Sequence, residues 1–139
     1  MALEEKINKF MPEIEPYLKG APVVFKFWGQ FFMQWLGEMD GLFVFTEDTI
    51  YVRGKATFKS GWGGIAKSGD VRIIPYQYLR TLITKKNKAV IVYDGAMEGK
   101  PGKQGKMTIA PYPEKGESKE DYITRANVYF DYIKKKAGL

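Results

Sequence analysis

The chain of 139 residues contains neither cysteine nor histidine. Without thiols or imidazoles it cannot form a disulfide, a thiolate nucleophile, a zinc finger or a Ser-His-Asp triad. A long apolar run is also missing, because polar residues interrupt the most apolar window, residues 21–36. A membrane-spanning helix needs about 20 predominantly apolar residues, and this window falls short. The N-terminus does not have the pattern of a targeting segment, so we expect a cytoplasmic protein.

Charge is unevenly distributed along the chain. Residues 1–50 carry four Lys and eight acidic residues, a net charge of 4 − 8 = −4. Residues 51–139 carry 18 basic and eight acidic residues, a net charge of 18 − 8 = +10. This asymmetry predicts a basic face that attracts phosphates, anionic lipid or an acidic partner. A solvated lysine-rich surface that only keeps the protein in solution is the alternative.

Catalytic motifs are not visible in the sequence. The segment 99–106 is rich in glycine and lysine, but Gln104 breaks the spacing of a phosphate-binding P-loop. Glu38 and Asp40 are neighbouring acids in an expected turn, without the burial that a general acid–base pair requires. We therefore predict a protein that is not an enzyme and that uses no cofactor and no metal.

Alternating apolar and polar residues, bounded by glycine, proline and polar turns, predict seven short antiparallel strands. These are Val23–Leu36, Leu42–Phe45, Thr49–Arg53, Val71–Pro75, Leu79–Thr84, Ala89–Tyr93 and Lys106–Ala110. Residues 37–41, 46–48 and 85–88 have the composition of turns. The remaining connections, 54–70 and 94–105, are glycine-rich and predict loops.

The first of these strands has a competing interpretation. In Val23–Leu36 every odd position except Gly29 is apolar, which favours a strand with a bulge or bend at the glycine. Lys26, Gln30 and Gln34 recur every four residues, however, and would form one polar stripe on a helix. The aromatic residues favour the strand.

Helices are expected at both ends of the chain. Apolar residues at helical spacing predict a short helix in the segment 1–20, which Pro12 and Pro16 punctuate before Gly20 ends it. An apolar stripe near the C-terminus predicts an amphipathic helix over 118–136. Ser118 is its expected N-cap and Gly138 its stop.

Together these elements predict one mainly β domain with flanking helices over residues 1–139. It comprises the N-terminal helical segment 1–20, antiparallel strands over 22–111 and the C-terminal helix at 118–136. Seven short strands followed by one amphipathic helix predict a bent half-barrel or sandwich that the helix closes. The sequence shows neither an internal repeat nor a linker.

Two stretches of the sequence resemble the bacterial pleckstrin-homology-like domains. One is Gly41-Leu-Phe-Val-Phe-Thr-Glu-Asp-Thr-Ile-Tyr-Val-Arg53, and the other is Asp70-Val-Arg-Ile-Ile-Pro-Tyr-Gln-Tyr-Leu-Arg80. Residues 15–20, which precede the first strand, are similar to that family's entry segment. The resemblance covers residues 13–139 and implies a bent seven-stranded antiparallel sheet capped by a C-terminal helix. It implies no particular chemistry, because one fold hosts many functions.

The two glycine-rich loops carry the candidate binding residues. In the topology that the resemblance implies, these loops lie at the same end of the sheet. The candidate anion- or lipid-binding residues are Arg53, Lys55, Lys59, Trp62, Lys67, Lys100, Lys103 and Lys106. An amphipathic tryptophan suits a bilayer interface, a base or a protein partner. Solvated hairpins without a ligand are the alternative. The acidic turn at 37–41 argues against specific recognition of inositol phosphates, which that family's relatives bind with a basic loop at this position.

The aromatic first strand carries a candidate interface. If its odd positions face the core, Trp28 and Phe32 lie on its other face with little polar cover. An exposed patch of this kind is typical of an oligomer or partner contact. The alternative is that the N-terminal helix covers the patch.

Three functional hypotheses follow from these observations. The first is a non-enzymatic pleckstrin-homology-like interaction domain that binds a protein partner or forms a homo-oligomer. The second is a peripheral module that binds an anionic membrane or a phosphate through the two basic loops. The third is a carrier of a small ligand inside the half-barrel. Nucleic acid is not an expected partner, because only Lys26 interrupts the aromatic residues of the first strand.

Overall fold

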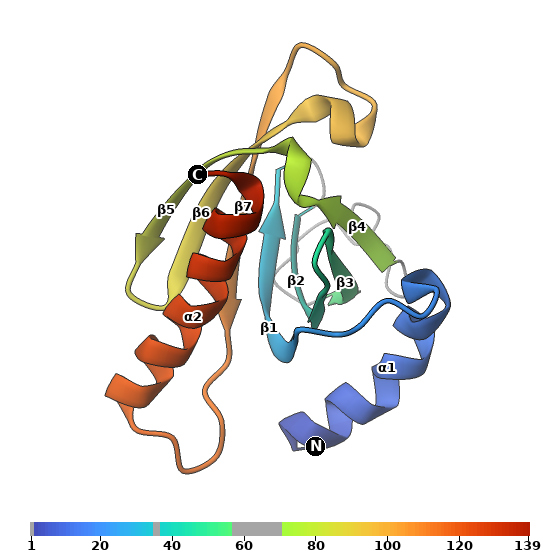
Figure 1. Cartoon of the computed structure of the whole chain (residues 1–139). Coiled ribbons are helices and arrows are strands. Elements are labelled where there is room, and N and C mark those ends of the chain that lie inside the picture. Colours follow the sequence, from blue (N-terminus) through green and yellow to red (C-terminus); the bar gives the residue numbers. More distant parts are fainter. Residues whose placement is uncertain (1, 35–36, 57–70) are drawn as a thin grey trace.

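A computed structural model describes residues 2–34, 37–56 and 71–139, with the backbone alone at 55 and 56. In these residues, seven antiparallel strands form one curled half-barrel sheet, with a helix at each end of the chain (Figure 1). The strands are β1 (Phe25–Met33), β2 (Gly37–Phe45), β3 (Thr49–Ala56), β4 (Val71–Pro75), β5 (Leu79–Lys85), β6 (Lys88–Asp94) and β7 (Gln104–Pro111). The helices are α1 (Leu3–Leu18) and α2 (Lys119–Ala137), with short 3₁₀ turns η2 (Tyr76–Tyr78) and η3 (Gly95–Glu98). The predicted mainly β architecture with flanking helices is confirmed.

The sheet consists of two meanders joined by one long-range pairing. Its strand order is β4-β3-β2-β1-β7-β6-β5, so β1 is hydrogen-bonded both to its sequence neighbour β2 and to β7. The curled sheet has a concave inner face and an outer face. Side chains alternate between these two faces along each strand. The odd positions of β1 point inward, as the sequence pattern predicts.

The larger hydrophobic core lies between the inner face and α2. Phe27 of β1 stacks on Phe43 of β2, with ring centroids 4.8 Å apart, and on Tyr129 of α2 at 4.4 Å. Phe130 and Ile133 of α2 are fully buried in the same core. Figure 1 shows α2 (red) alongside β5, β6 and β7. The predicted apolar stripe therefore closes the half-barrel.

The ends of α2 also match the prediction. The Ser118 side chain accepts a hydrogen bond of 3.1 Å from the backbone N–H of Asp121. Gly138 ends the helix with a φ of 71°, in the left-handed region that glycine adopts without a steric penalty. The cap residues that the sequence indicated are those of the structure.

A smaller core lies on the outer face beneath α1. Ile14 is fully buried there, and Phe10 stacks on Trp28 of β1 with ring centroids 5.6 Å apart. Trp28 is only 3% exposed, so the alternative in which the N-terminal helix covers this residue is confirmed. Trp28 does not lie on the surface of the chain, because α1 occupies the space above it.

The helix α1 lies within the predicted segment 1–20 but is not broken at its prolines. It runs without interruption from Leu3 to Leu18 and contains both Pro12 and Pro16, which the sequence analysis expected to punctuate it. A proline in a helix removes one backbone hydrogen bond and disfavours the helical conformation of the residue before it. Burial of Phe10 and Ile14 against the sheet offsets that cost, which sequence periodicity alone does not reveal.

The boundary between the first two strands also differs from the prediction. The strand β1 spans Phe25–Met33 rather than Val23–Leu36, and 37–41 forms the start of β2 instead of a turn. Polar side chains in this strand have partners across the outer face, since Gln30 donates to Glu38. The register also continues through Gly29, which stands opposite Gly41 without a bulge.

Three glycines form a row across the inner face. Gly29 stands opposite Gly41, and Gly41 opposite Gly54. A Cβ atom on Gly41 would lie 2.7 Å from the backbone oxygen of Arg53, and one on Gly29 would lie 2.8 Å from that of Ala110. Side chains crowd on the concave side of a curled sheet, so the row relieves crowding where the strands approach closely.

Candidate functional site

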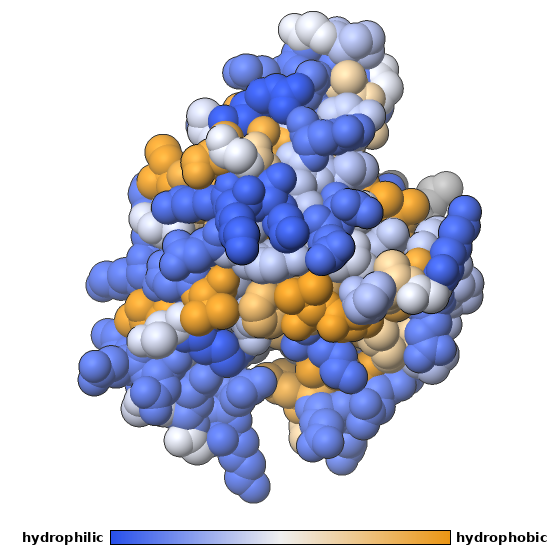
Figure 2. All heavy atoms as spheres, viewed as in Figure 1, coloured by the Kyte–Doolittle hydropathy of each residue, from blue (hydrophilic) through white to orange (hydrophobic). Residues whose placement is uncertain are grey.

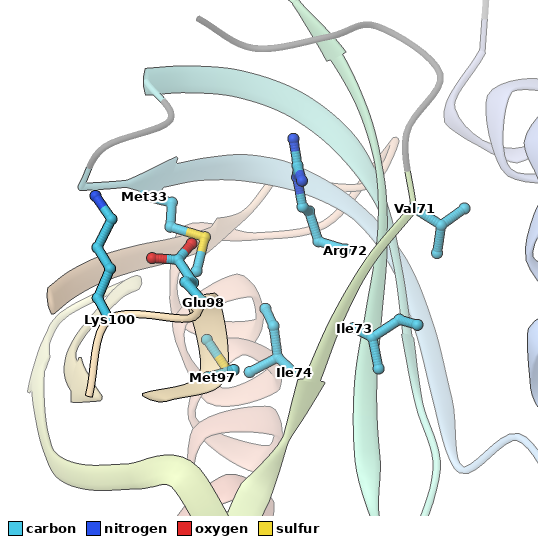
Figure 3. Close-up of a pocket in the computed structure, with 8 residues that line it drawn as sticks. All are labelled: Met33, Val71, Arg72, Ile73, Ile74, Met97, Glu98 and Lys100. Carbon is cyan, nitrogen blue, oxygen red and sulfur yellow. The ribbon is translucent and has the colours of Figure 1, made fainter. Parts of the chain in front are cut away.

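A hollow of about 450 Å³ opens at the end of the half-barrel where β1 finishes and β4 begins. Among the described residues, its lining comes from three separate parts of the chain: Met33 of β1, residues 71–74 of β4, and Met97, Glu98 and Lys100 of the β6–β7 connection. Figure 3 shows Val71 and Ile73 pointing away from the space that the other six residues surround. The fold thus places the start of β4, which follows the first predicted loop in sequence, close to the β6–β7 connection.

The sequence analysis missed Arg72, which is part of this hollow. Arg72 stands opposite Val52, a buried core residue, so its side chain is on the inner face of the sheet. The neighbouring inward position, Ile74, is fully buried. The sequence contained a signal for this position. Alternation along 71–75 places Arg72 on the same face of the strand as the apolar Ile74.

The predicted basic residues do not gather at one place in the described part of the chain. Arg53 lies on the outer face against α1, where its Nε donates to Glu13 at 3.2 Å and its guanidinium covers the Phe10 ring at 4.6 Å. The side chain of Arg53 is therefore held by α1 rather than directed toward the hollow. Lys59, Trp62 and Lys67 lie outside the described residues, and Lys55 is described by its backbone alone.

The β6–β7 lysines also occupy different positions. Lys100 lines the hollow, whereas Lys103 is exposed on the following turn and does not line it. Lys106 stands opposite Val92 on the outer face of the sheet. The connection that carries Lys100 and Lys103 projects at the top of Figures 1 and 2, where hydrophilic side chains predominate.

Hydrogen bonding orders one side of the hollow. The Tyr93 hydroxyl donates to a carboxylate oxygen of Glu98 at 2.9 Å, and Glu98 belongs to the 3₁₀ turn η3. Burial and the bond to this carboxylate raise the pKa of the Tyr93 hydroxyl well above its ordinary value. Tyr93 therefore stays protonated near neutral pH and holds Glu98 in place.

An apolar strip on the outer face is left uncovered by both helices. Phe32 stands opposite Thr108, Thr108 opposite Val90, and Val90 opposite Ile83, so four neighbouring strands contribute one residue each. Phe32 is 43% exposed and Ile83 is 60% exposed. None of the four belongs to the core under α1 or to the core under α2. We call these four residues the bare strip.

Lysines surround the bare strip. Lys85 and Lys88 form a facing pair beside it, and Lys106 lies beyond its other side. A depression of about 220 Å³ next to Phe32 is lined in part by Lys88 and Glu38. Residues 79–111 carry seven basic and two acidic side chains, a net charge of 7 − 2 = +5. The uncovered half of the sheet is thus the basic half.

Acidic groups on the outer face are engaged by neighbouring side chains. The Tyr112 hydroxyl donates to Asp40 at 2.5 Å, while Gln30 donates to Glu38. Burial and the bond to Asp40 raise the pKa of Tyr112 well above its ordinary value, so it remains a donor. These pairings keep the carboxylates in fixed positions at the border of the bare strip.

The described residues offer little for metal or membrane-spanning roles. Across 2–34, 37–56 and 71–139, no group of three or more acidic side chains is arranged to hold a metal ion. In the same described residues, neither α1 nor α2 is long and apolar enough to cross a membrane.

Comparison with known proteins identifies no family. No protein-family model matches the chain, and no curated protein sequence does. Among solved structures, the chain is similar to the C-terminal domain of an unknown protein from Leishmania infantum, with 9% sequence identity and a TM-score of 0.57 over 95% of this chain and 97% of that one. It is also similar to the hSac2 domain from the human phosphoinositide phosphatase Sac2, with 11% identity and a TM-score of 0.50 over 98% and 83%. At such identities the likeness concerns the fold alone.

Proposed function

We propose that this chain is a non-enzymatic interaction domain of the pleckstrin-homology-like kind, and that it binds an acidic, partly apolar segment of a protein partner across the bare strip. The observation that carries the proposal is the continuous row of Phe32, Thr108, Val90 and Ile83, which is uncovered. Three lysines border it, together with Glu38 opposite Phe32. Exposed apolar patches with a polar border are typical of protein-binding surfaces.

The non-enzymatic part of the proposal has separate support. Cysteine, which supplies thiolate nucleophiles, and histidine, which is the side chain that normally titrates near neutral pH, are absent from the sequence. The count of seven strands and the capping helix agree with the pleckstrin-homology-like resemblance. These features favour a domain that acts by binding.

Charge favours a different protein over a second copy of this chain. If two copies packed strip against strip about a two-fold axis, each would present the same surface to the other. Lys85, Lys88 and Lys106 outnumber Glu38 around the strip, so both copies would present a net positive surface, and like charges in an interface oppose association. An acidic segment would instead place carboxylates against the lysines while its apolar residues cover Phe32.

Peptide display on the immobilised full chain tests this proposal. A random library is selected on the wild-type chain and counter-selected on the Phe32→Glu variant, and enriched peptides are synthesised and titrated calorimetrically. We expect peptides in which Asp or Glu flank apolar residues. We expect Phe32→Glu to weaken their binding at least about tenfold, since it places a charge in the centre of the contact.

A matched control tests whether binding is lost because the bare strip is changed or because a negative charge is added to the surface. Val128 on α2 is 47% exposed, close to the exposure of Phe32, so Val128→Glu introduces the same charge at a distant apolar position. We expect it to change binding less than about twofold. Enrichment of basic peptides, or of peptides that ignore Phe32→Glu, would contradict the proposal. A wild-type dimer that Phe32→Glu converts to a monomer would replace it with self-association.

A further inference from the structure

The bare strip runs across its four strands rather than along any one of them. It takes one residue from each of β1, β7, β6 and β5, from Phe32 at one end to Ile83 at the other. Neighbouring strands lie about 4.8 Å apart, so the strip is about 14 Å long. In the described sheet β5 is an outermost strand, and a segment that paired with its edge would lie beside Ile83 but far from Phe32. A segment that covers the whole strip must therefore cross the strands.

The other half of the same face shows how a segment crosses these strands. Helix α1 passes from β1, where Phe10 stacks on Trp28, to β3, where the Tyr51 hydroxyl donates to the backbone oxygen of Tyr17 at 3.4 Å. A helix rises about 5.4 Å per turn, which is close to the spacing between strands. Successive turns of a crossing helix thus meet successive strands, and about ten helical residues span the bare strip. Apolar residues three or four positions apart would contact its four residues in turn.

The end of the bare strip at Phe32 is negative. Glu38 of β2 stands opposite Phe32 and extends the row beyond β1. Gln30 donates to the Glu38 carboxylate and holds it at this end. The bond does not neutralise Glu38, because an amide donor carries no charge.

The opposite end of the bare strip is positive. Lys85 and Lys88 form a facing pair at the end that β5 and β6 provide, and Lys106 flanks the middle of the strip. All three lysines are exposed, and none of their side chains forms a salt bridge with another residue that the structure describes. A helix carries partial positive charge at its N-terminus and partial negative charge at its C-terminus. It is therefore most stable on the strip when its N-terminus lies at Glu38.

We propose that the partner segment is an amphipathic helix that crosses the bare strip with its N-terminus at Glu38 and its C-terminus at Lys85 and Lys88. Its apolar residues recur every three or four positions, and its acidic residues lie mainly in the C-terminal half, where they meet the lysines. This inference rests on the proposed function, because it assigns a conformation and a direction to the partner of that same surface.

A pair of synthetic peptides tests the conformation. The first is an alanine-based peptide of about 16 residues with leucine at every third or fourth position and glutamates beside the leucine stripe in its C-terminal half. The second has the same composition, but its leucines alternate with the other residues as in a strand. Each is titrated into the ¹⁵N-labelled full chain and followed by NMR. We expect the helical peptide to bind at least about fivefold more tightly than the alternating one.

The direction can be measured because this chain contains no cysteine. A nitroxide is attached to a single cysteine added at either the N-terminus or the C-terminus of the helical peptide, so no label can attach to the chain. We expect the N-terminal nitroxide to broaden the amide signal of Glu38 most strongly. The C-terminal nitroxide should instead broaden the amide signals of Lys85 and Lys88.

A charge reversal at the positive end tests the contribution of the lysines. We expect Lys88→Glu to weaken binding of the helical peptide at least about fivefold, because it places like charges together. Lys103→Glu makes the same change at an exposed lysine of the β6–β7 connection, away from the strip, and we expect less than about a twofold effect. Circular dichroism of both variants verifies that they are folded.

The outcomes separate this inference from the proposed function. Equal or tighter binding of the alternating peptide, or broadening in the reverse direction, would overturn the helical assignment. Shifts confined to β5 would indicate an added strand and would overturn it as well. If peptide display yields acidic peptides that depend on Phe32 while the helical peptide does not bind, the proposed function stands and the helix is rejected. If neither binds, both proposals fail.

Discussion

The inner and outer faces of the sheet differ in how completely a helix covers them. On the inner face, α2 places Tyr129, Phe130 and Ile133 into a core that reaches both meanders. On the outer face, α1 packs against β1, β2 and β3, with Val71 of β4 beside it, and the part formed by β5, β6 and β7 carries the bare strip. One sheet therefore places apolar residues in three environments. These are the core enclosed by α2, the smaller core beneath α1 and the uncovered bare strip.

This difference separates stability from binding. An apolar side chain contributes to the free energy of unfolding in proportion to the area that folding removes from water. Phe130 and Ile14 have lost all of their exposure, whereas Ile83 retains 60%. Residues of the bare strip thus contribute less to folding than the core residues do, and they keep apolar area for a partner. Graded substitutions from the inner core to the bare strip test this distinction.

The largest effect is expected for Phe130→Ala in the inner core. The substitution leaves a cavity between α2 and the sheet, and truncation of a buried phenylalanine costs about 3–5 kcal/mol. Chemical denaturation of the purified variant measures this loss. A change below about 1 kcal/mol would show that α2 does not enclose the core in solution.

A smaller loss is expected for Ile14→Ala beneath α1. Ile14 is fully buried, but its core is smaller and one helix forms its whole cover, so the site can relax more readily. We expect a decrease of about 2–3 kcal/mol in the free energy of unfolding, measured by the same denaturation. A loss equal to that of Phe130→Ala would remove the difference between the two cores.

Ion pairs at the two helices provide the next comparison. Arg125 of α2 donates to Glu117 at 2.7 and 3.0 Å, and these bonds hold the pKa of Glu117 below its ordinary value. We expect Glu117→Gln to cost about 1 kcal/mol at neutral pH, allowing for solvent screening. Glu13→Gln removes the partner of Arg53 at the more exposed α1 pair, and we expect a smaller cost.

The sign of the pH dependence follows from the lowered pKa of Glu117. Its contribution is fully present above the unfolded value of about 4.3 and is lost as pH falls through the folded value. The stability difference between wild type and Glu117→Gln should therefore disappear in acid. Denaturation curves at neutral and acidic pH measure it, and a difference that grew in acid would contradict this assignment.

A loss smaller than in either core is expected for Phe32→Ala in the bare strip. Phe32 is 43% exposed and belongs to neither core, so we expect the free energy of unfolding to fall by only about 1 kcal/mol. Chemical denaturation provides the measurement. A loss above about 2 kcal/mol would mean that the strip is part of the folded core rather than a surface for binding.

Local patterns in the sequence predicted most of the fold. The helix over 118–136 carried its cap residues and its apolar stripe, and the structure has α2 at Lys119–Ala137. The start of β2 was misassigned because glycines and acids in 37–41 have the composition of a turn. Their strand conformation depends on partners far away in the sequence, such as Tyr112, which bonds Asp40.

The candidate site was less predictable for the same reason. Sequence analysis identified Lys100 by its glycine-rich context and Phe32 by its place on the mixed face of the first strand. It missed Arg72, and it grouped Arg53 with the other cations although α1 holds Arg53 on the outer face. A local pattern assigns a residue to a face of its own strand, but it does not show which helix will cover that face.

The pairing of β1 with β7 has a consequence for the order of folding. It joins residues that stand 74 positions apart (Met33 and Met107) to 82 positions apart (Gly29 and Pro111). The other strand pairs join neighbours in sequence, so each meander can form through short loop closures before the chain is joined end to end. The β1–β7 contact therefore carries the largest loop-closure entropy in the sheet and sets the slow step of assembly. Substitutions in the β5–β6 hairpin, which forms before this step, should slow folding and leave unfolding nearly unchanged, whereas those along the β1–β7 contact should divide their effect between the two rates.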